Sequence, residues 1–121
     1  MPDRRKASKS DYVHVVTIDS IPGYEVKNVK GFVWATTVRS KFIGKDILAV
    51  LRMIVGGEIP EYTDMINEAK RYVIEKMVEN ARVLGANAVI GVRIDTTSQI
   101  LPGAVEIYAY GTAVVVEPKK R

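Results

Sequence analysis

The chain has 121 residues, with 18 lysines and arginines against 14 aspartates and glutamates and a formal net charge of +4. Hydrophobic residues make up 47% and charged residues 26%, a composition typical of one folded domain and not of a disordered chain. There is no cysteine, and there is one histidine. Disulfides, thiolate metal sites and cysteine nucleophiles are therefore excluded, as is any site that needs two imidazoles from one chain.

The positive charge is concentrated at the two ends of the chain. Residues 1–10 carry a net charge of +3 and residues 119–121 another +3, so removing these six charges from +4 leaves residues 11–118 at −2. We expect a flexible basic arm over residues 1–11, a single domain over residues 12–117 and a basic tail over residues 118–121. Such tails favour only weak, salt-sensitive attraction to polyanions.

The hydropathy pattern contains no membrane or export signal. No run of apolar residues reaches the 18 or so that a membrane span requires. The basic start of the chain is followed by polar residues and not by the apolar stretch of a secretory signal. These features predict a cytoplasmic protein with no membrane partner.

Two β-prone segments open the domain. Residues 13–18 are rich in β-branched side chains and end in the turn-forming stretch 19–23. Residues 24–38 continue the β-prone pattern over a length that is unusual for one strand. We therefore predict two strands, the second with a bend or bulge at Gly31.

Helical periodicity follows. Apolar residues at spacings of three and four predict a first helix that begins near Ile43 or Asp46 and reaches Ile54. It should end at Gly56 and Gly57, because glycine readily adopts the left-handed conformation that closes helices.

A second helix is predicted over residues 61–84, which contain no proline or glycine and carry apolar residues at helical spacing. Gly85 should end it. Ile74 and Val78 lie off its main apolar stripe and form a second, narrower one. A helix with two apolar sides in a small domain indicates that one side faces the sheet and the other a partner.

The last two segments, residues 87–95 and 104–116, alternate apolar and polar side chains and predict an antiparallel hairpin. Gly111 interrupts the alternation and is predicted to mark a bulge. The elements together predict an α+β fold. It has a mostly antiparallel sheet with two helices packed on one face, in the order β-β-α-α-β-β.

Several residues carry groups that chemistry could use. His14 could carry a proton or ligate a metal shared between subunits, but no carboxylate or second histidine lies at a supporting spacing, so an edge-strand position is the better interpretation. Glu58, Glu61, Asp64 and Glu68 could attract a hard cation, although they lack the loop of a calcium site and are typical of a solvated helix start.

The double glycine precedes the second helix, whose free N–H groups and dipole favour a small carboxylate or phosphate. It lacks the spaced glycines and lysine of a P-loop, so a turn between helices is the simpler interpretation. We assign any ligand to this turn, between subunits, with the binding residues Gly56, Gly57, Glu58 and Tyr62.

Two further groups lie on the strands. Arg93 and Asp95 share one strand face and, with Glu106, could line a polar pocket or form an ordinary cross-strand ion pair. Trp34, Tyr108 and Tyr110 could stack on a base or flavin, or fill a subunit interface, and the interface is the favoured interpretation.

Four features recur together along the domain as one sequence pattern. They are the double glycine, a long helix, a glycine-rich start of the following strand and a glycine in the last strand. The residues of the pattern are Gly56-Gly57, Tyr62, Ala69, Arg71, Ala81, Leu84-Gly85-Ala86-Asn87-Ala88-Val89-Ile90-Gly91, Asp95 and Gly111-Thr112-Ala113-Val114. Over about residues 24–116, this pattern resembles the YbjQ-like family. The resemblance implies a dodecin-like subunit that assembles into a ring-shaped homopentamer, and it implies no established activity.

The family also carries a heavy-metal-binding label, which suits this chain poorly. Soft metals prefer sulfur and imidazole, and the chain has no cysteine and one histidine, which lies outside the matched region. We therefore expect a non-enzymatic, homopentameric module that uses no cofactor and either holds a small ligand between subunits or acts as a scaffold. The alternative is a metal-binding protein or metal-dependent enzyme whose carboxylates, Glu58, Glu61 and Asp95, are shared across the interface.

Overall fold

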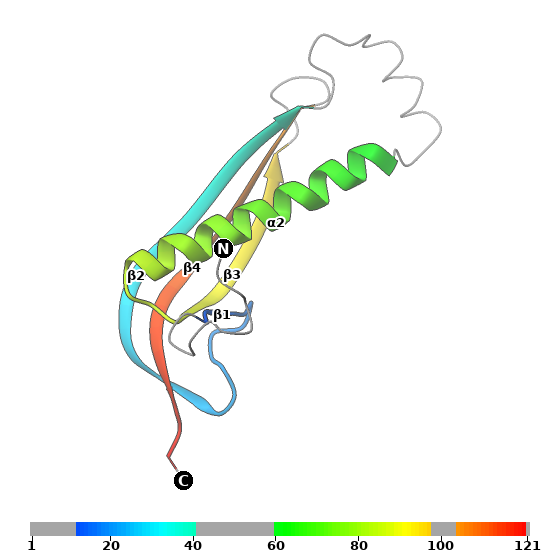
Figure 1. The fold of residues 1–121 in the computed structure, drawn as a ribbon. Coiled ribbons are helices and arrows are strands. Elements are labelled where there is room, and N and C mark those ends of the chain that lie inside the picture. The colour runs from blue at the N-terminus through cyan, green and yellow to red at the C-terminus, as the bar shows by residue number, and fades with distance from the viewer. Residues whose placement is uncertain (1–11, 41–59, 98–103, 121) are drawn as a thin grey trace, which may run out of the picture.

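The structure, a computed structural model, describes residues 12–40, 60–97 and 104–120 (Figure 1). Its elements are β1 (His14–Val15), β2 (Tyr24–Ser40), α2 (Pro60–Val83), β3 (Ala88–Thr97) and β4 (Ala104–Pro118). The strands form one curved sheet in the order β1-β3-β4-β2, and α2 lies diagonally across one of its faces. No helix among the described residues is long and apolar enough to cross a membrane.

The strand directions correct the predicted fold class. β4 pairs antiparallel with both β2 and β3, but β1 pairs parallel with β3, so the sheet is mixed. The described residues contain one helix, in the order β-β-α-β-β, and the prediction of two helices on a mostly antiparallel sheet is wrong. The helix predicted from Ile43 to Ile54 lies outside the described residues.

The physical reason lies in the chain between the first two strands. The predicted turn over residues 19–23 does not fold β2 back against β1, because β3 and β4 lie between them. β1 is instead held by β3: the His14 N–H donates to the Asn87 carbonyl at 3.0 Å, and the Val16 N–H to the Val89 carbonyl at 3.1 Å. Alternation in a sequence predicts extended backbone, but it does not predict which strand will be the neighbour.

The core is a stripe of α2 packed against β2 and β4. Ala69, Val73, Met77 and Ala81 recur every four residues on one helix face, and all four are fully buried. Opposite them lie the buried side chains of the sheet: Val33, Ala35, Val105, Ile107, Ala109 and Ala113. The many alanines bring the helix close to the sheet, so a single layer of side chains fills the space between them.

The helix ends where the sequence predicts. Gly85 has a φ of 85°, and its N–H donates to the Arg82 carbonyl at 2.8 Å, while the Ala86 N–H donates to the Ala81 carbonyl. A left-handed residue with these two bonds is a common way to close a helix. Gly31 is also confirmed as a point of irregularity, since the pairing of β2 with β4 shifts between Val29 and Gly31.

The opposite face of the sheet has a smaller core at one end. Ala88, Val114 and Val116 are buried there beneath Ile21, Tyr24 and Ile90. The segment that connects β1 to β2 therefore covers part of the face that α2 does not reach. The Arg93 guanidinium helps to hold this segment, because it donates to the Thr17 carbonyl at 2.8 Å.

Gly111 has a role that differs from the predicted one. It pairs regularly with Val33 on β2, and the bulge lies in the neighbouring β3, between Ile90 and Arg93, where Gly91 has a φ of 62°. A Cβ atom on Gly111 would lie 2.7 Å from Val89 Cγ1 and 3.1 Å from the Ile90 carbonyl oxygen. Gly111 thus makes room for the bulged β3.

We predict that Gly111→Ala destabilises the fold by roughly 1–3 kcal/mol, because the added methyl group must displace Val89 or the backbone of β3. Urea unfolding at a fixed protein concentration measures the change. Thr112→Ala, on the other face of the same strand, is the control and should cost less. Equal stability of Gly111→Ala and the parent chain would contradict the close approach.

Asn87 connects three strands. Its side-chain Nδ2 donates to the Val116 carbonyl at 2.9 Å, and its Oδ1 accepts from the Val116 N–H at 2.8 Å. Its backbone N–H donates to the Val114 carbonyl, and its carbonyl accepts from the His14 N–H. The residue therefore continues the β3 ladder along β4 and also fixes β1.

We predict that Asn87→Asp lowers the free energy of unfolding by about 1–3 kcal/mol, because a carboxylate keeps the bond from the Val116 N–H but cannot donate to its carbonyl. Chemical denaturation at neutral pH tests this. Asn28→Asp makes the same change at an exposed position on β2 and should be nearly neutral. An equal effect at both positions would argue against the paired bonds.

Candidate functional site

Aromatic and aliphatic side chains gather on the sheet face opposite α2. We call this surface the aromatic face; it consists of Phe32, Trp34 and Val38 on β2 and Tyr108 and Tyr110 on β4. Phe32, Trp34 and Val38 are 60%, 58% and 56% exposed. Soluble monomers rarely expose so many large apolar groups together, so this surface is the leading candidate for a binding function.

The rings form one connected group. The centroids of Phe32 and Trp34 lie 5.4 Å apart in a stacked arrangement, Phe32 and Tyr110 are 6.0 Å apart, and Tyr108 stacks on Tyr110 at 6.2 Å. Strand pairing produces this contact, because Trp34 lies opposite Tyr110 and Thr36 opposite Tyr108. Trp34, Tyr108 and Tyr110 thus lie on one surface, with Phe32 as a member that the sequence reading missed, and their burial in a subunit interface stays a prediction.

A second apolar group lies at the other edge of the sheet. We call these residues the β1 patch; they are Tyr12, Val15 and Ile18, which are 63%, 37% and 52% exposed. They follow one another along this edge, with Tyr12 beside His14 on one face and Val15 opposite Val89 on the other. β1 and β2 are the two edge strands of the sheet. The aromatic face and the β1 patch therefore belong to opposite edges of the sheet, and they differ in composition, since one is mainly aromatic and the other mainly aliphatic.

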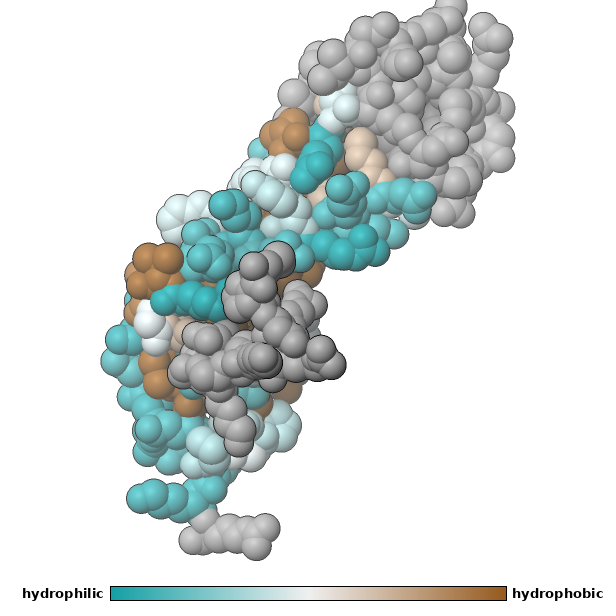
Figure 2. All heavy atoms as spheres, in the orientation of Figure 1, coloured by the Kyte–Doolittle hydropathy of each residue, from teal (hydrophilic) through white to brown (hydrophobic). Residues whose placement is uncertain are grey.

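The side of the molecule that carries α2 is mostly polar, as Figure 2 shows. Hydrophobic colour gathers there where the last turns of α2 meet β2, and the exposed residues at this helix end include Val83 and Leu84. The predicted partner-facing strip of Ile74 and Val78 is only half exposed, and Val78 packs against the core of its own chain. The helix strip therefore offers less free apolar surface than the aromatic face does.

The predicted ligand residues fall at the boundary of the described chain. Gly56, Gly57 and Glu58 lie outside the described residues, and Tyr62 lies in the first turn of α2. Their role as a ligand site stays a prediction. Asp64 and Glu68 are exposed along the first half of α2, as expected of a solvated helix start.

The register of β3 and β4 places the polar residues that the sequence offered either as a pocket lining or as a cross-strand ion pair. Asp95 lies opposite Tyr108, and Glu106 lies opposite Thr97 and not opposite Arg93. The Arg93 guanidinium is occupied by the carbonyls of Thr17 and Val92. On β2, the Lys27 ammonium lies 2.7 Å from Glu25 and lowers the pKa of that carboxyl group, but both side chains are exposed and form an ordinary surface ion pair.

Comparison with known proteins supports the sequence resemblance. A family model of the YbjQ type, described as "Putative heavy-metal-binding", matches residues 13–117. A UPF0145 protein of Thermus thermophilus is 54% identical over 88% of this chain and 92% of its own, and one of Pyrococcus furiosus is 49% identical over 91% and 96%. The match extends beyond the predicted range to include β1 and His14.

A solved structure has a similar fold. A protein with unknown function of the DUF74 family from Pediococcus pentosaceus matches with a TM-score of 0.60, over 87% of this chain and 98% of its own. The two sequences are 18% identical, so this likeness concerns the fold alone.

The donor groups of the chain do not fit a heavy metal. Thiolates are absent from the sequence, and the half-buried His14 ring packs between Tyr12 and Tyr24, with centroid distances of 4.8 and 4.9 Å. Over residues 12–40, 60–97 and 104–120, no group of three His, Asp or Glu side chains could hold a metal ion. Soft metals need sulfur or several imidazoles, which one chain cannot supply. The alternative with Glu58, Glu61 and Asp95 across an interface stays a prediction.

We predict that calorimetric titration with Zn²⁺ gives no saturable binding at micromolar protein, and that His14→Gln behaves as the parent chain does. The reason is that one imidazole packed between two tyrosine rings is a poor isolated ligand. Saturable zinc binding that His14→Gln removes would contradict this and would indicate a site shared between chains.

Proposed function

Because the chain belongs to the YbjQ family, we propose that it is a non-enzymatic module that works as a homo-oligomer, a ring of five subunits, and holds a small ligand between them. The observation that supports it most strongly is the pair of unlike apolar groups on opposite edges of the sheet, the aromatic face and the β1 patch. The number five comes from the family resemblance.

The aromatic face supplies the driving force for association. Burying one large aromatic or aliphatic side chain is worth roughly 1.5–3 kcal/mol, and the exposed side chains of Phe32, Trp34 and Val38 lie on one surface. Aromatic residues are enriched in the buried centres of subunit interfaces. Tyr108 and Tyr110 extend this surface and bring hydroxyl groups that can bond across it.

The β1 patch determines the geometry of association. When one surface of a subunit binds a different surface of the next, the contact is head-to-tail, and it generates a ring if the rotation closes. A twofold dimer would instead pair the aromatic face with itself and leave Tyr12, Val15 and Ile18 in water. A head-to-tail contact buries both the aromatic face and the β1 patch, so the presence of both groups favours the ring.

Other parts of the proposal rest on the sequence. The ligand at Gly56, Gly57, Glu58 and Tyr62, the cytoplasmic location and the weak attraction of the basic ends to polyanions stay predictions. A ring would multiply six basic charges per chain and strengthen such attraction.

We predict that the parent chain has a mass near five times 13.4 kDa in light scattering, while Trp34→Glu and the double variant Val15→Glu, Ile18→Glu are each monomeric. Each variant keeps one intact half of a head-to-tail contact. Mixing the two should therefore give a one-to-one pair that cannot grow further.

Val83→Glu is the matched control, because it places the same charge on an exposed residue outside both groups and should leave the assembly intact. Circular dichroism checks that every variant is folded. A parent chain that stays monomeric at micromolar concentration refutes the proposal. A double variant that still self-associates alone would replace the ring with a twofold contact through the aromatic face.

A further inference from the structure

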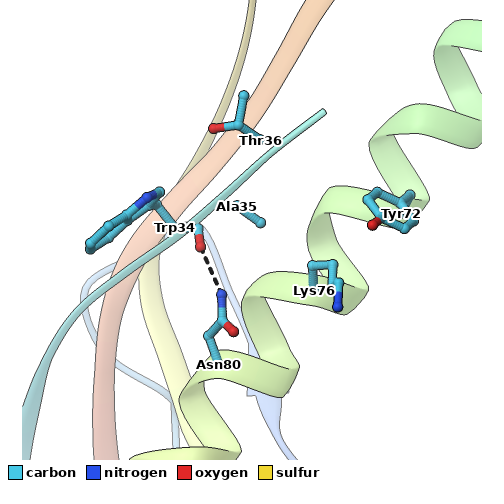
Figure 3. A pocket seen from close by; sticks show the side chains of 6 residues that line it. All are labelled: Trp34, Ala35, Thr36, Tyr72, Lys76 and Asn80. Atoms are coloured by element: carbon cyan, nitrogen blue, oxygen red, sulfur yellow. Dashed lines mark hydrogen bonds between the residues drawn. The ribbon is translucent and has the colours of Figure 1, made fainter. Parts of the chain in front are cut away.

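A groove runs between the edge of β2 and the second half of α2. It consists of two adjoining cavities of about 300 and 290 Å³, which share Trp34 and Asn80. Figure 3 shows the first, lined by Ala35 and Thr36 from β2 and by Tyr72 and Lys76 from α2, with the Trp34 ring turned away from the helix. This groove is separate from the turn at Gly56 and Gly57.

The helix side of the groove is one row of polar side chains. Tyr72, Lys76 and Asn80 recur every four residues, beside the buried stripe of α2. Asn80 Nδ2 donates to the Trp34 carbonyl oxygen at 3.0 Å, and the two cavities adjoin at this bond (Figure 3). The bond holds helix and strand edge at a fixed separation, so both cavities are formed in the free chain.

The first cavity has a positive character. The Lys76 ammonium is part of its lining, and no carboxylate lines it. Beside it, the Arg39 guanidinium lies over the Tyr72 ring, 5.2 Å from the centroid. The carboxylate of Glu79, on the same helix, is paired with Arg82 at 3.3 Å. An anion in this cavity would therefore meet the Lys76 ammonium, with the Arg39 guanidinium nearby over the Tyr72 ring.

The second cavity is apolar. Its lining consists of Phe32, Val33, Trp34 and Leu84, with Asn80 as the polar member. From Phe32 to Thr36 the strand advances about 14 Å at 3.4 Å per residue. The groove is thus cationic at one end and apolar at the other, over the length of a small amphiphilic molecule.

We infer that this groove binds a medium-chain carboxylic acid, with the carboxylate at Lys76 and the hydrocarbon chain across Asn80 toward Phe32 and Leu84. A carboxylate matches the Lys76 charge, and the hydrocarbon chain covers the apolar lining of the second cavity. The inference goes beyond the proposed function, since every lining residue belongs to one chain. The groove also meets β2 on the side of α2, whereas the aromatic face presents the Phe32 and Trp34 rings on the opposite side.

Calorimetric titration tests the inference directly, and the emission of Trp34, the single tryptophan in the sequence, is a second readout because its backbone adjoins both cavities. Octanoate, below the concentration at which it aggregates, should bind in a saturable way. Lys76→Gln should weaken the affinity at least tenfold, while Lys70→Gln, the same change on the same helix outside the groove, should leave it unaltered. Octanol, which lacks the charge, should bind at least tenfold more weakly than octanoate.

Two results would overturn the inference: no saturable binding of octanoate, or equal affinity of the parent chain and Lys76→Gln. Light scattering on the same samples keeps the outcome separate from self-association. The double variant Val15→Glu, Ile18→Glu retains Trp34 and the whole groove, so it should bind octanoate as the parent does. If the parent chain binds octanoate but stays monomeric, the proposal of a ring is refuted and the groove stands. If the parent chain assembles but does not bind octanoate, the groove is refuted and the ring stands.

Discussion

The paired hydrogen bonds between the Asn87 side chain and the backbone of Val116 determine where the helix gives way to the sheet. α2 closes at Gly85, and two residues later Asn87 is already bonded to β4 as though it were part of a strand. This short connection fixes the start of β3 relative to the end of the helix. The buried stripe of Ala69, Val73, Met77 and Ala81 can lie over β4 and β2 only because this junction sets its position.

The two faces of the sheet have different partners as a result. One face is covered by α2, and the other is covered at one end by the segment that connects β1 to β2, which Arg93 holds through Thr17. The remaining part of that second face carries Phe32, Trp34, Tyr108 and Tyr110. Among the described residues these side chains stay exposed, and a further copy of the same chain would cover them.

The sequence predicts those features that depend on neighbouring residues. The helix over residues 61–84 agrees with the observed Pro60–Val83, and Gly31 and Gly85 lie at the expected irregularity and helix end, because glycine conformation is a local property. The parallel pairing of β1, the location of the bulge in β3 and not in β4, and the contact from Asn80 to Trp34 were not predictable. Each joins segments far apart in the chain, 46 residues in the last case, and one sequence carries no signal for such pairs. For the same reason the groove at Lys76 was missed, and the proposed ligand turn at Gly56 and Gly57 lies outside the described residues.

The bond from Asn80 to the Trp34 carbonyl also bears on the danger that accompanies any long strand at a sheet edge. β2 has 17 residues, and one of its sides has no strand beside it among the described elements. Such an edge can recruit strands from other molecules and extend into a fibril. The Asn80 amide already occupies the Trp34 carbonyl near the middle of β2, and α2 lies beside it. A strand from another molecule would therefore be obstructed at the point where its backbone would have to bond to β2. The chain can thereby offer apolar side chains to a partner while resisting open-ended growth of its sheet.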